Sequence, residues 1–341
     1  MNSLFKRNFL RLIDFSENEI KNILLLSHYL KKCKKLGTEI KYLNGKNILL
    51  IFEKPSTRTR CSFEVSAFDQ GANITYIDQN TSQMHKKESV KDTSIVLGKM
   101  YDAIQYRGYN QNYIENIAKY SKIPVWNGLT NEFHPTQLIA DLLTIEENIK
   151  YKPFNKINLT YIGDASNNIG NSLLEASAVT GLNLTLVSPK YYFPNKKLIN
   201  YCTLLSKNKG GNINITEDIL NGVKASDFIY TDVWLSMGDN KSQWKKKIKN
   251  LRNYQLNSDI INLIDNKNVK FLHCLPSFHN NNSDIGKKIS KKYGFKNGIE
   301  VTNDVFESEY SLVFKQAENR LHTIKAIMIY TLNKNVNIKI I

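Results

Sequence analysis

The stretch "KNILLIFEKPSTRTRCSFEVSAFDQG", residues 46–71, joins a short apolar run to a mixed apolar and polar run through a polar turn. The run 46–52 is nearly all apolar, which is typical of a buried β-strand. The run 60–70 is expected to be a helix, which Gly71 ends, because glycine suits the residue after a helix. A buried strand that leads directly into a helix is the repeating unit of α/β proteins with parallel sheets.

The same alternation continues along the chain and predicts an α/β fold with two domains, each a mainly parallel sheet flanked by helices. A chain of 341 residues, 41% of them apolar, is long enough for two hydrophobic cores. The polar segment 150–156 contains Pro153 and marks the expected boundary between domains 1–150 and 151–308. Strands are expected at 46–52, 72–78, 102–107, 123–128, 157–163, 182–188, 227–233 and 269–276. Helices are expected at 16–35, 60–70, 89–100, 113–120, 135–149, 167–181 and 316–332.

Composition argues against a membrane, secreted or metal-binding protein. The apolar runs are shorter than the roughly 20 residues that cross a bilayer, and the N-terminus lacks the pattern of a secretory signal. The four cysteines are scattered singly, and the six histidines form no HxxxH or HExxH motif. We therefore expect a cytoplasmic protein with no membrane contact, no metal and no cofactor.

The net charge of +16 first suggests a nucleic-acid partner. The lysines, however, lie in separate short runs, which are typical of solvated helix faces. We expect no nucleic-acid partner, although a positive field can attract anionic substrates.

Two arginines stand where a helix begins, which is an unfavourable place for cations. A helix N-terminus disfavours a cation by about 0.3–1 kcal/mol, so Arg58 and Arg60 suggest a negative ligand. Ser56 is a candidate N-cap, and the free N–H groups of the first turn can hold a phosphate together with guanidinium groups. The alternative is a capped helix whose arginines face solvent. The GxxxxGK[ST] pattern of a P-loop is absent.

The segment "NEFHPTQ", residues 131–137, predicts a second helix start. Pro135 suits the first helical position, so His134 lies at the N-terminus and Gln137 in the first turn. A neutral imidazole and an amide can both hydrogen-bond a carbonyl oxygen, and such bonds strengthen as that oxygen becomes an oxyanion. The alternative is a purely structural cap.

Three further reactive side chains follow predicted strands: Arg107 in "QYRGY", Asp232 in "TDVWLSMGD" and Cys274 in "FLHCLP". The carboxyl ends of parallel strands form the edge where α/β sheets bind ligands. A lone cysteine is more often an inert buried thiol, and Asp232 could equally be a helix cap.

The motifs "FEKPSTRTRCSFEVSAFDQGA", "NGLTNEFHPTQLIADLLT", "DFIYTDVWLSMG" and "FLHCLPSFH", in this order, resemble the ornithine carbamoyltransferase family. The resemblance extends from about Phe9 to Thr331 and includes "VFESEYSLVFKQAENRLHTIKA". It implies a carbamoyl phosphate-binding domain 1–150, an ornithine-binding domain 151–308, and a helix at about 309–333 that returns to the first domain. It also implies an active site in the cleft between the domains, a homotrimer, and no metal.

The resemblance further implies which residues bind each substrate. The carbamoyl phosphate residues would be Ser56, Thr57, Arg58, Thr59, Arg107, His134, Gln137, Cys274, the backbone of Leu275, Arg320, and Gln83 lent by a neighbouring subunit. The ornithine residues would be Asn168, Asp232, Ser236 and Met237. His85 and Lys86 stand where the family pattern has Gly followed by His. A residue with a Cβ resists backbone shapes that Gly allows, so this departure bears on how Gln83 reaches the neighbouring site.

The implied reaction is attack of the neutral δ-amine of ornithine on the carbamoyl carbon, which gives citrulline and phosphate, an arginine-biosynthesis or urea-cycle type of step. The residues implied in catalysis divide into three groups. Arg58, Arg107 and Arg320 would stabilise the leaving phosphate, His134 the oxyanion, and Asp232 with Cys274 would orient the amine and take its proton.

Other functions remain as alternatives. A carbamoyltransferase that uses aspartate would need cations at the second site, yet Ser277 and Phe278 stand where aspartate-using relatives usually carry an arginine. Acetylated or succinylated ornithine and putrescine would need other groups around the α-amino end. A non-catalytic, basic binding protein is disfavoured because Arg58, His134 and Cys274 are all present. The segment "GDASNNIGNS" lacks GxGxxG, which disfavours a nicotinamide oxidoreductase.

Overall fold

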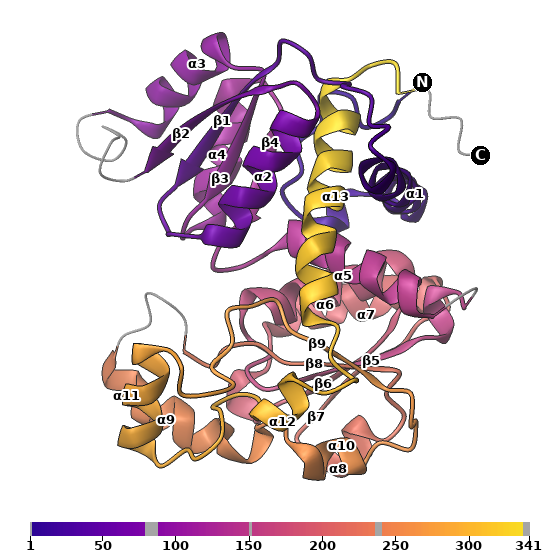
Figure 1. The fold of residues 1–341 in the computed structure, drawn as a ribbon, viewed down its shortest axis with the longest axis vertical. Coiled ribbons are helices and arrows are strands. Elements are labelled where there is room, and N and C mark those ends of the chain that lie inside the picture. The colour runs from indigo at the N-terminus through magenta and orange to yellow at the C-terminus, as the bar shows by residue number, and fades with distance from the viewer. Residues whose placement is uncertain (1, 79–87, 150–151, 236–240, 337–341) are drawn as a thin grey trace. The chain divides into compact units, whose positions relative to one another are not determined.

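The computed structural model describes residues 2–78, 88–149, 152–235 and 241–336 (Figure 1). The chain divides into two compact units. The first unit is Met1–Leu143 together with Ala317–Ile341, and the second is Thr144–Gln316. None of the helices within the described ranges combines the length and the apolar character that crossing a membrane requires.

The first unit is built on a four-stranded parallel sheet with the order β2-β1-β3-β4. Its strands are β1 (Asn47–Phe52), β2 (Asn73–Asp78), β3 (Ala103–Arg107) and β4 (Val125–Leu129). Its helices are η1 (Leu12–Asp14), α1 (Glu17–Leu36), α2 (Thr57–Asp69), α3 (Val90–Met100), α4 (Gln111–Ser121) and α5 (Pro135–Asn148), which runs on into the second unit. Ile104 and Val125 from the strands pack against Ile114 and Ile117 of α4 in the core of this unit.

The last helix, α13 (Val313–Leu332), belongs to the first unit from Ala317 onward. The indole Nε1 of buried Trp126 on β4 donates to Thr331 Oγ1 at 3.0 Å. The ammonium group of Lys325 is fully buried and lies 2.7 Å from Asp69 Oδ2 of α2. A buried lysine needs such partners, because an unpaired charge is costly inside a protein. These contacts hold the C-terminal helix against elements that are far earlier in the chain.

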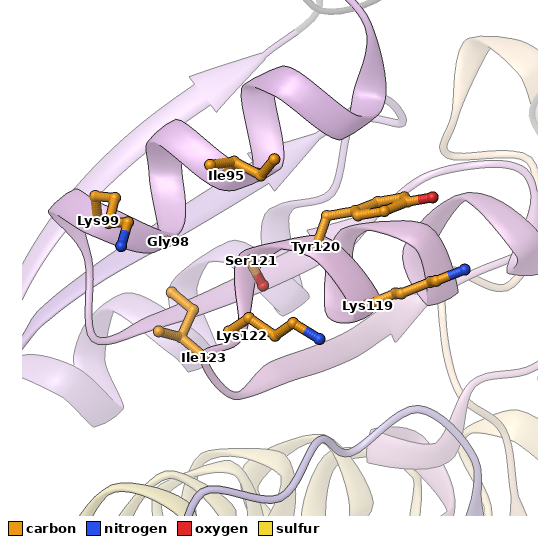
Figure 2. A pocket seen from close by; sticks show the side chains of 8 residues that line it. All are labelled: Ile95, Gly98, Lys99, Lys119, Tyr120, Ser121, Lys122 and Ile123. Atoms are coloured by element: carbon orange, nitrogen blue, oxygen red, sulfur yellow. The ribbon is translucent and has the colours of Figure 1, made fainter.

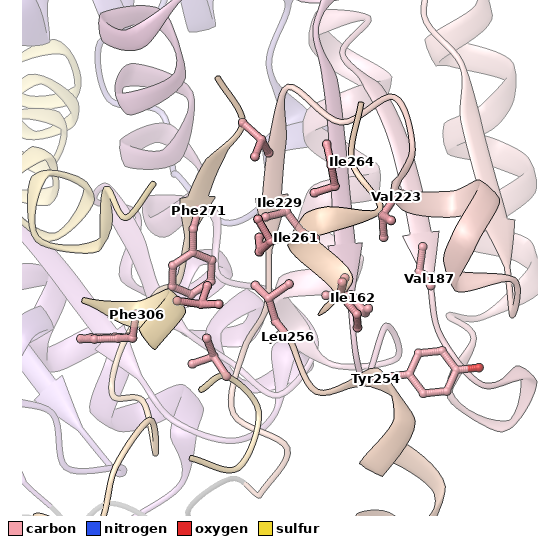
Figure 3. Packing of buried hydrophobic residues seen from close by; sticks show 14 of the residues in the cluster. Ile162, Val187, Val223, Ile229, Tyr254, Leu256, Ile261, Ile264, Phe271 and Phe306 are labelled. Carbon is pink, nitrogen blue, oxygen red and sulfur yellow. The ribbon is translucent and has the colours of Figure 1, made fainter. Parts of the chain in front are cut away.

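The second unit is built on a five-stranded parallel sheet with the order β7-β6-β5-β8-β9. Its strands are β5 (Asn158–Ile162), β6 (Asn183–Val187), β7 (Ile213–Thr216), β8 (Phe228–Tyr230) and β9 (Lys270–Leu272). Its further helices are η2 (Phe154–Lys156), α6 (Asn168–Thr180), η3 (Lys190–Tyr192), α7 (Lys196–Asn208), α8 (Ile219–Val223), α9 (Lys241–Leu251), η4 (Arg252–Tyr254), α10 (Ser258–Asn262), α11 (Asp284–Tyr293) and α12 (Asn303–Phe306). Figure 3 shows the core on one face of this sheet, where Ile162, Ile229 and Phe271 of neighbouring strands pack with Ile261 of α10.

Each sheet has a point where the strand order reverses, which is where open α/β sheets bind ligands beyond the carboxyl ends of the strands. In the first unit this point lies between β1 and β3, where Phe52 is the register partner of Arg107. In the second unit it lies between β5 and β8, where Tyr161 is the partner of Tyr230. The two loci are therefore the loops after β1 and β3, and the loops after β5 and β8.

Two expected strands end earlier than the sequence predicted, and one strand was missed. The strands expected at 227–233 and 269–276 end at Tyr230 and Leu272, so Asp232 and Cys274 lie in the loops that follow. The strand Ile213–Thr216 was missed because it is short and only partly buried at the edge of the sheet.

A separate surface pocket of about 530 Å³ lies between α3 and α4 in the first unit (Figure 2). It is lined by Ile95, Gly98, Lys99, Lys119, Tyr120, Ser121, Lys122 and Ile123. Gly98 allows the two helices to approach closely, since a Cβ there would lie 2.0 Å from the carbonyl oxygen of Ser121. The pocket contains none of the residues that the sequence predicted for the active site.

Candidate active site

The first turn of α2 brings two cations onto one buried hydroxyl group. Ser56 is the N-cap, and its side chain accepts a hydrogen bond from the Thr59 N–H at 3.2 Å. Thr59 is fully buried, and its Oγ1 accepts from Arg107 Nη1 at 3.3 Å and from Arg320 Nη2 at 2.8 Å. Thr59 therefore orients guanidinium groups that come from β3 and from α13, beside a helix N-terminus that adds further positive potential.

Arg60 was expected to serve the same anion as Arg58, and the structure gives it another partner. The Arg60 Nε donates to Glu64 Oε1 at 2.8 Å, one turn later on α2. Its guanidinium group also lies over the ring of Tyr76, 3.8 Å from the ring centre. A carboxylate on the same helix thus compensates this cation, as pairs four residues apart commonly do.

His134 lies directly before α5, which begins at Pro135 as the sequence predicted. Its side chain is buried, and Nδ1 lies 3.5 Å from Thr136 Oγ1. The pKa of His134 lies well below its usual value, first because burial disfavours the charged ring and then because Arg320, Arg107 and Arg58 repel a further positive charge. The imidazole is therefore neutral at physiological pH, and burial is the largest cause.

Gln137, in the first turn of α5, is 1% exposed and keeps one polar atom available. Its Nε2 donates to Asp141 Oδ1 at 2.8 Å. Its Oε1 is buried and accepts no hydrogen bond from the residues that the structure describes. A buried acceptor without a donor is costly unless a ligand supplies one, so Gln137 suits a ligand with an N–H group.

The second unit places a buried carboxylate after β8. Asp232 is 7% exposed, and its Oδ1 accepts from its neighbour Val233 N at 2.7 Å and from Cys274 Sγ at 3.0 Å. Its Oδ2 accepts from Asn167 Nδ2 at 3.2 Å. Burial raises the pKa of Asp232, and the nearby carboxylate of Glu300 raises it further. This carboxylate suits a ligand cation, which would replace the lost hydration.

Glu300 holds the loop that carries Cys274 and Leu275. Its fully buried Oε1 accepts from the Phe278 N–H at 2.7 Å and from Ser277 Oγ at 2.8 Å. Leu275 has a φ of +55°, a left-handed conformation that is unfavourable for a residue with a side chain. The hydrogen bonds to Glu300 therefore help to stabilise a strained backbone.

Asp232, His273 and Cys274 offer ligand atoms within 4.8 Å of one another, which is close enough for a metal ion. Nδ1 of His273, however, accepts the Leu275 N–H at 2.9 Å, and its Nε2 lies 3.3 Å from Glu300 Oε1. Nδ1 would therefore have to give up the Leu275 N–H to bind an ion, and Nε2 faces a carboxylate outside this loop.

The predicted site residues within the described ranges fall into two groups, one in each unit, and several others lie outside those ranges. Thr59, Arg107, Arg320, His134 and Gln137 lie in the first unit with Ser56, Thr57 and Arg58, whereas Asp232, Cys274 and Leu275 lie in the second. Asn168 is the first residue of α6, in the second unit. Gln83, Ser236 and Met237, together with His85 and Lys86, lie outside the described residues. Asn167 and Glu300 were missed. Asn167 was predicted as the first residue of a helix, whereas it is the N-cap of α6.

Comparison with known proteins identifies the family. Residues 7–147 match the carbamoyl-P binding domain of aspartate/ornithine carbamoyltransferase, and residues 155–331 match its Asp/Orn binding domain. The chain is 58% identical to an ornithine carbamoyltransferase of Blochmanniella floridana, over 98% of this chain and 97% of that protein.

Solved structures agree with this result. The ornithine carbamoyltransferase of Pyrococcus furiosus is 35% identical, with a TM-score of 0.86 over 97% of this chain and 98% of that one. The enzyme of Gloeobacter violaceus is 30% identical, with a TM-score of 0.80 over 97% of this chain and 100% of that one. The chain therefore belongs to the aspartate/ornithine carbamoyltransferase family.

Proposed function

We propose that this chain transfers the carbamoyl group of carbamoyl phosphate to the δ-amine of L-ornithine, which yields L-citrulline and phosphate. The observation that carries the proposal is the convergence of Arg107 and Arg320 on Thr59 at the capped start of α2. Guanidinium groups and helix N–H groups are the donors that bind phosphate best in proteins. Ser56, Thr57, Arg58 and Thr59 would hold the phosphate together with the other two arginines.

His134 and Gln137 would bind the carbamoyl end of the same substrate. A neutral imidazole N–H can donate to the carbamoyl oxygen, and it gains strength as negative charge develops there. The buried Gln137 Oε1 can accept from the carbamoyl NH₂, which supplies the donor that this atom needs. A donor for the oxygen and an acceptor for the nitrogen would distinguish a carbamoyl group from a carboxylate.

Asp232 and Cys274 would bind and orient the amine of ornithine, with Asn168, Ser236 and Met237 around the rest of the amino acid. The free amine is largely protonated at neutral pH, so it must lose a proton before attack. Asp232 lies in hydrogen-bond contact with Cys274, and the two would pass this proton on. The backbone of Leu275 would complete the carbamoyl site.

The reaction follows from these positions. The neutral amine attacks the carbamoyl carbon, the carbonyl oxygen becomes an oxyanion, and the carbon–oxygen bond to phosphate breaks. His134 stabilises the oxyanion, and Arg58, Arg107 and Arg320 stabilise the phosphate as it leaves. Holding both substrates in line contributes much of the rate.

The same proposal includes five further points. These are the domain limits 1–150 and 151–308, a homotrimer, the contribution of Gln83 to a neighbouring site, a cytoplasmic location and a place in arginine biosynthesis. The family resemblance supports them. A subunit that lacks its neighbour's loop would be incomplete, so dilution to monomers should abolish activity.

The test is a citrulline assay with carbamoyl phosphate and four acceptors in parallel, namely ornithine, aspartate, acetylornithine and putrescine. We expect product with ornithine alone. The carboxylate of Asp232 favours a cationic acceptor over aspartate, and acetylornithine and putrescine lack the free α-amino acid group that Asn168, Ser236 and Met237 would bind. Turnover of aspartate at a rate similar to that of ornithine would show that the chain is a carbamoyltransferase that uses aspartate. Lack of product with every acceptor would refute catalysis.

A further inference from the structure

Asn167 uses both ends of its side chain, at the carboxyl end of β5. Its Oδ1 accepts from the Gly170 N–H at 2.8 Å, which caps α6. Its Nδ2 donates to Asp232 Oδ2 at 3.2 Å and to the Tyr161 hydroxyl oxygen at 3.1 Å. One residue therefore links the start of a helix to the carboxylate that follows β8.

We propose that Asn167 is a positioning residue for ornithine, because it fixes the orientation of the Asp232 carboxylate. This inference rests on the proposed function, in which Asp232 binds the amine. The opposite oxygen, Oδ1, is held by Val233 and Cys274. Because Asn167 Nδ2 donates to Asp232 Oδ2, both carboxylate oxygens have donors. The orientation of the carboxylate plane is therefore fixed before the substrate binds.

The contact has a chemical reason as well as a geometric one. Asp232 is almost fully buried, so its ionised form depends on donors that replace water. The charged and titratable groups that act on it are His273, Cys274, Glu300 and Tyr161. An amide donor stabilises the carboxylate without adding a charge of its own that would compete with the substrate cation.

The loop that carries Asn167 is held by other contacts, so the amide of Asn167 is not needed to fold it. The Tyr161 hydroxyl donates to the backbone oxygen of Asp164 at 3.0 Å. The Asp164 Oδ1 accepts from the Ser166 N–H at 3.0 Å, and its Oδ2 lies 2.7 Å from Lys247 Nζ on α9. A substitution at Asn167 can therefore change Asp232 while the loop keeps its shape.

The decisive variant is Asn167→Asp. Aspartate caps a helix as well as asparagine does, so α6 should be unaffected. It replaces the two N–H donors by an acceptor that faces Asp232. We expect the KM for ornithine to rise about 10- to 150-fold, the range for losing one hydrogen bond to a charged group, while the KM for carbamoyl phosphate stays within about twofold. A second variant, Asn167→Ser, keeps a cap and adds no charge, so its ornithine KM should rise less.

Asn257→Asp is a matched control in the same unit. Asn257 caps α10 with the same geometry, since its Oδ1 accepts from the Ile260 N–H at 3.0 Å, and it is not part of the proposed site. This control should leave both KM values and the thermal midpoint unchanged. A cap-only function of Asn167 would instead make Asn167→Asp behave like this control.

The outcomes separate the two proposals. If the unmodified chain forms no citrulline, the proposed function fails. If it forms citrulline and Asn167→Asp leaves the KM for ornithine unchanged, the positioning function of Asn167 is overturned. Equal rises in the KM values for both substrates would also overturn it, because they would indicate a general disturbance rather than a misplaced carboxylate.

Discussion

Thr59→Val tests the phosphate site with a change of almost no volume. Valine has the shape of threonine and lacks the oxygen that accepts hydrogen bonds from Arg107 at 3.3 Å and Arg320 at 2.8 Å. A hydrogen bond to a charged group contributes about 1.5–3 kcal/mol. The contact to Arg107 is long, so we count the loss as about one such bond. The expected fall in kcat/KM for carbamoyl phosphate is then about 10- to 150-fold, at about 1.36 kcal/mol per tenfold.

The assay is citrulline formation at saturating ornithine with carbamoyl phosphate varied. Thr59→Ser is the control, since it keeps the acceptor and loses a methyl group whose burial contributes only about 0.8 kcal/mol. The serine variant should retain most of the activity. If the valine variant matched the unmodified chain within twofold, Thr59 would not organise the arginines, and the reasoning for the phosphate site would be wrong.

Three further predictions concern the stability of the fold. The pKa of His322 is lowered to about 3, mainly by burial, while the unfolded side chain titrates near 6.5. The contribution of neutral His322 to the free energy of unfolding is therefore complete above pH 6.5. Below that pH the unfolded chain binds a proton that the folded chain does not, so this free energy should fall by about 1.4 kcal/mol per pH unit as pH drops towards 3. Urea unfolding at pH 7.5 and 5 should show a smaller fall for His322→Gln, and equal falls would contradict this. Glu300→Ala should cost about 1–3 kcal/mol for each buried donor left unpaired, such as the Phe278 N–H, whereas Glu300→Gln keeps an acceptor and should cost less in urea unfolding. Similar losses in both variants would refute the acceptor function. Gly98→Ala should lower the thermal midpoint, because a Cβ at this position would lie 2.0 Å from the Ser121 carbonyl oxygen. Overpacking typically costs about 1–3 kcal/mol, which exceeds the roughly 1 kcal/mol that alanine gains over glycine in helix propensity. An equal or higher midpoint would show that the two helices can move apart.

The sequence predicted elements well where one physical signal dominated. The apolar run at 46–52 became β1, and the helix expected at 316–332 lies within α13, because buried strands and long helices leave clear periodic patterns. The ends of strands were harder. After Tyr230 the run 227–233 still has two β-branched residues, Thr231 and Val233, yet pairing stops at Tyr230, and Asp232 between them has other partners. Tertiary contacts, rather than local preference, fix such ends.

The site was only partly visible in the sequence. Ser56 was expected to cap α2 and does so, because capping is a local interaction. The ion pair between Arg60 and Glu64 was missed, although a carboxylate four residues after an arginine on a helix is a signal for such a pair. Asn167 and Glu300 act on residues that are distant in the chain. Asp232 lies 65 positions from Asn167, and Phe278 lies 22 positions from Glu300. No local pattern carries such pairings.

The two units provide opposite charges, and this division has a physical reason. The first unit gathers three guanidinium groups that suppress the charge on His134, whereas the second holds the buried carboxylate of Asp232. A carboxylate within the arginine group would form paired hydrogen bonds with one of them, and phosphate would have to displace it. Because the opposite charges lie in different units, neither neutralises the other within its own unit, and in the proposed function each would remain available for the substrate group that complements it. In the proposed function, the phosphate of one substrate and the ammonium group of the other would supply these counter-charges, so each group of residues would gain its strongest electrostatic interactions only when its own substrate binds.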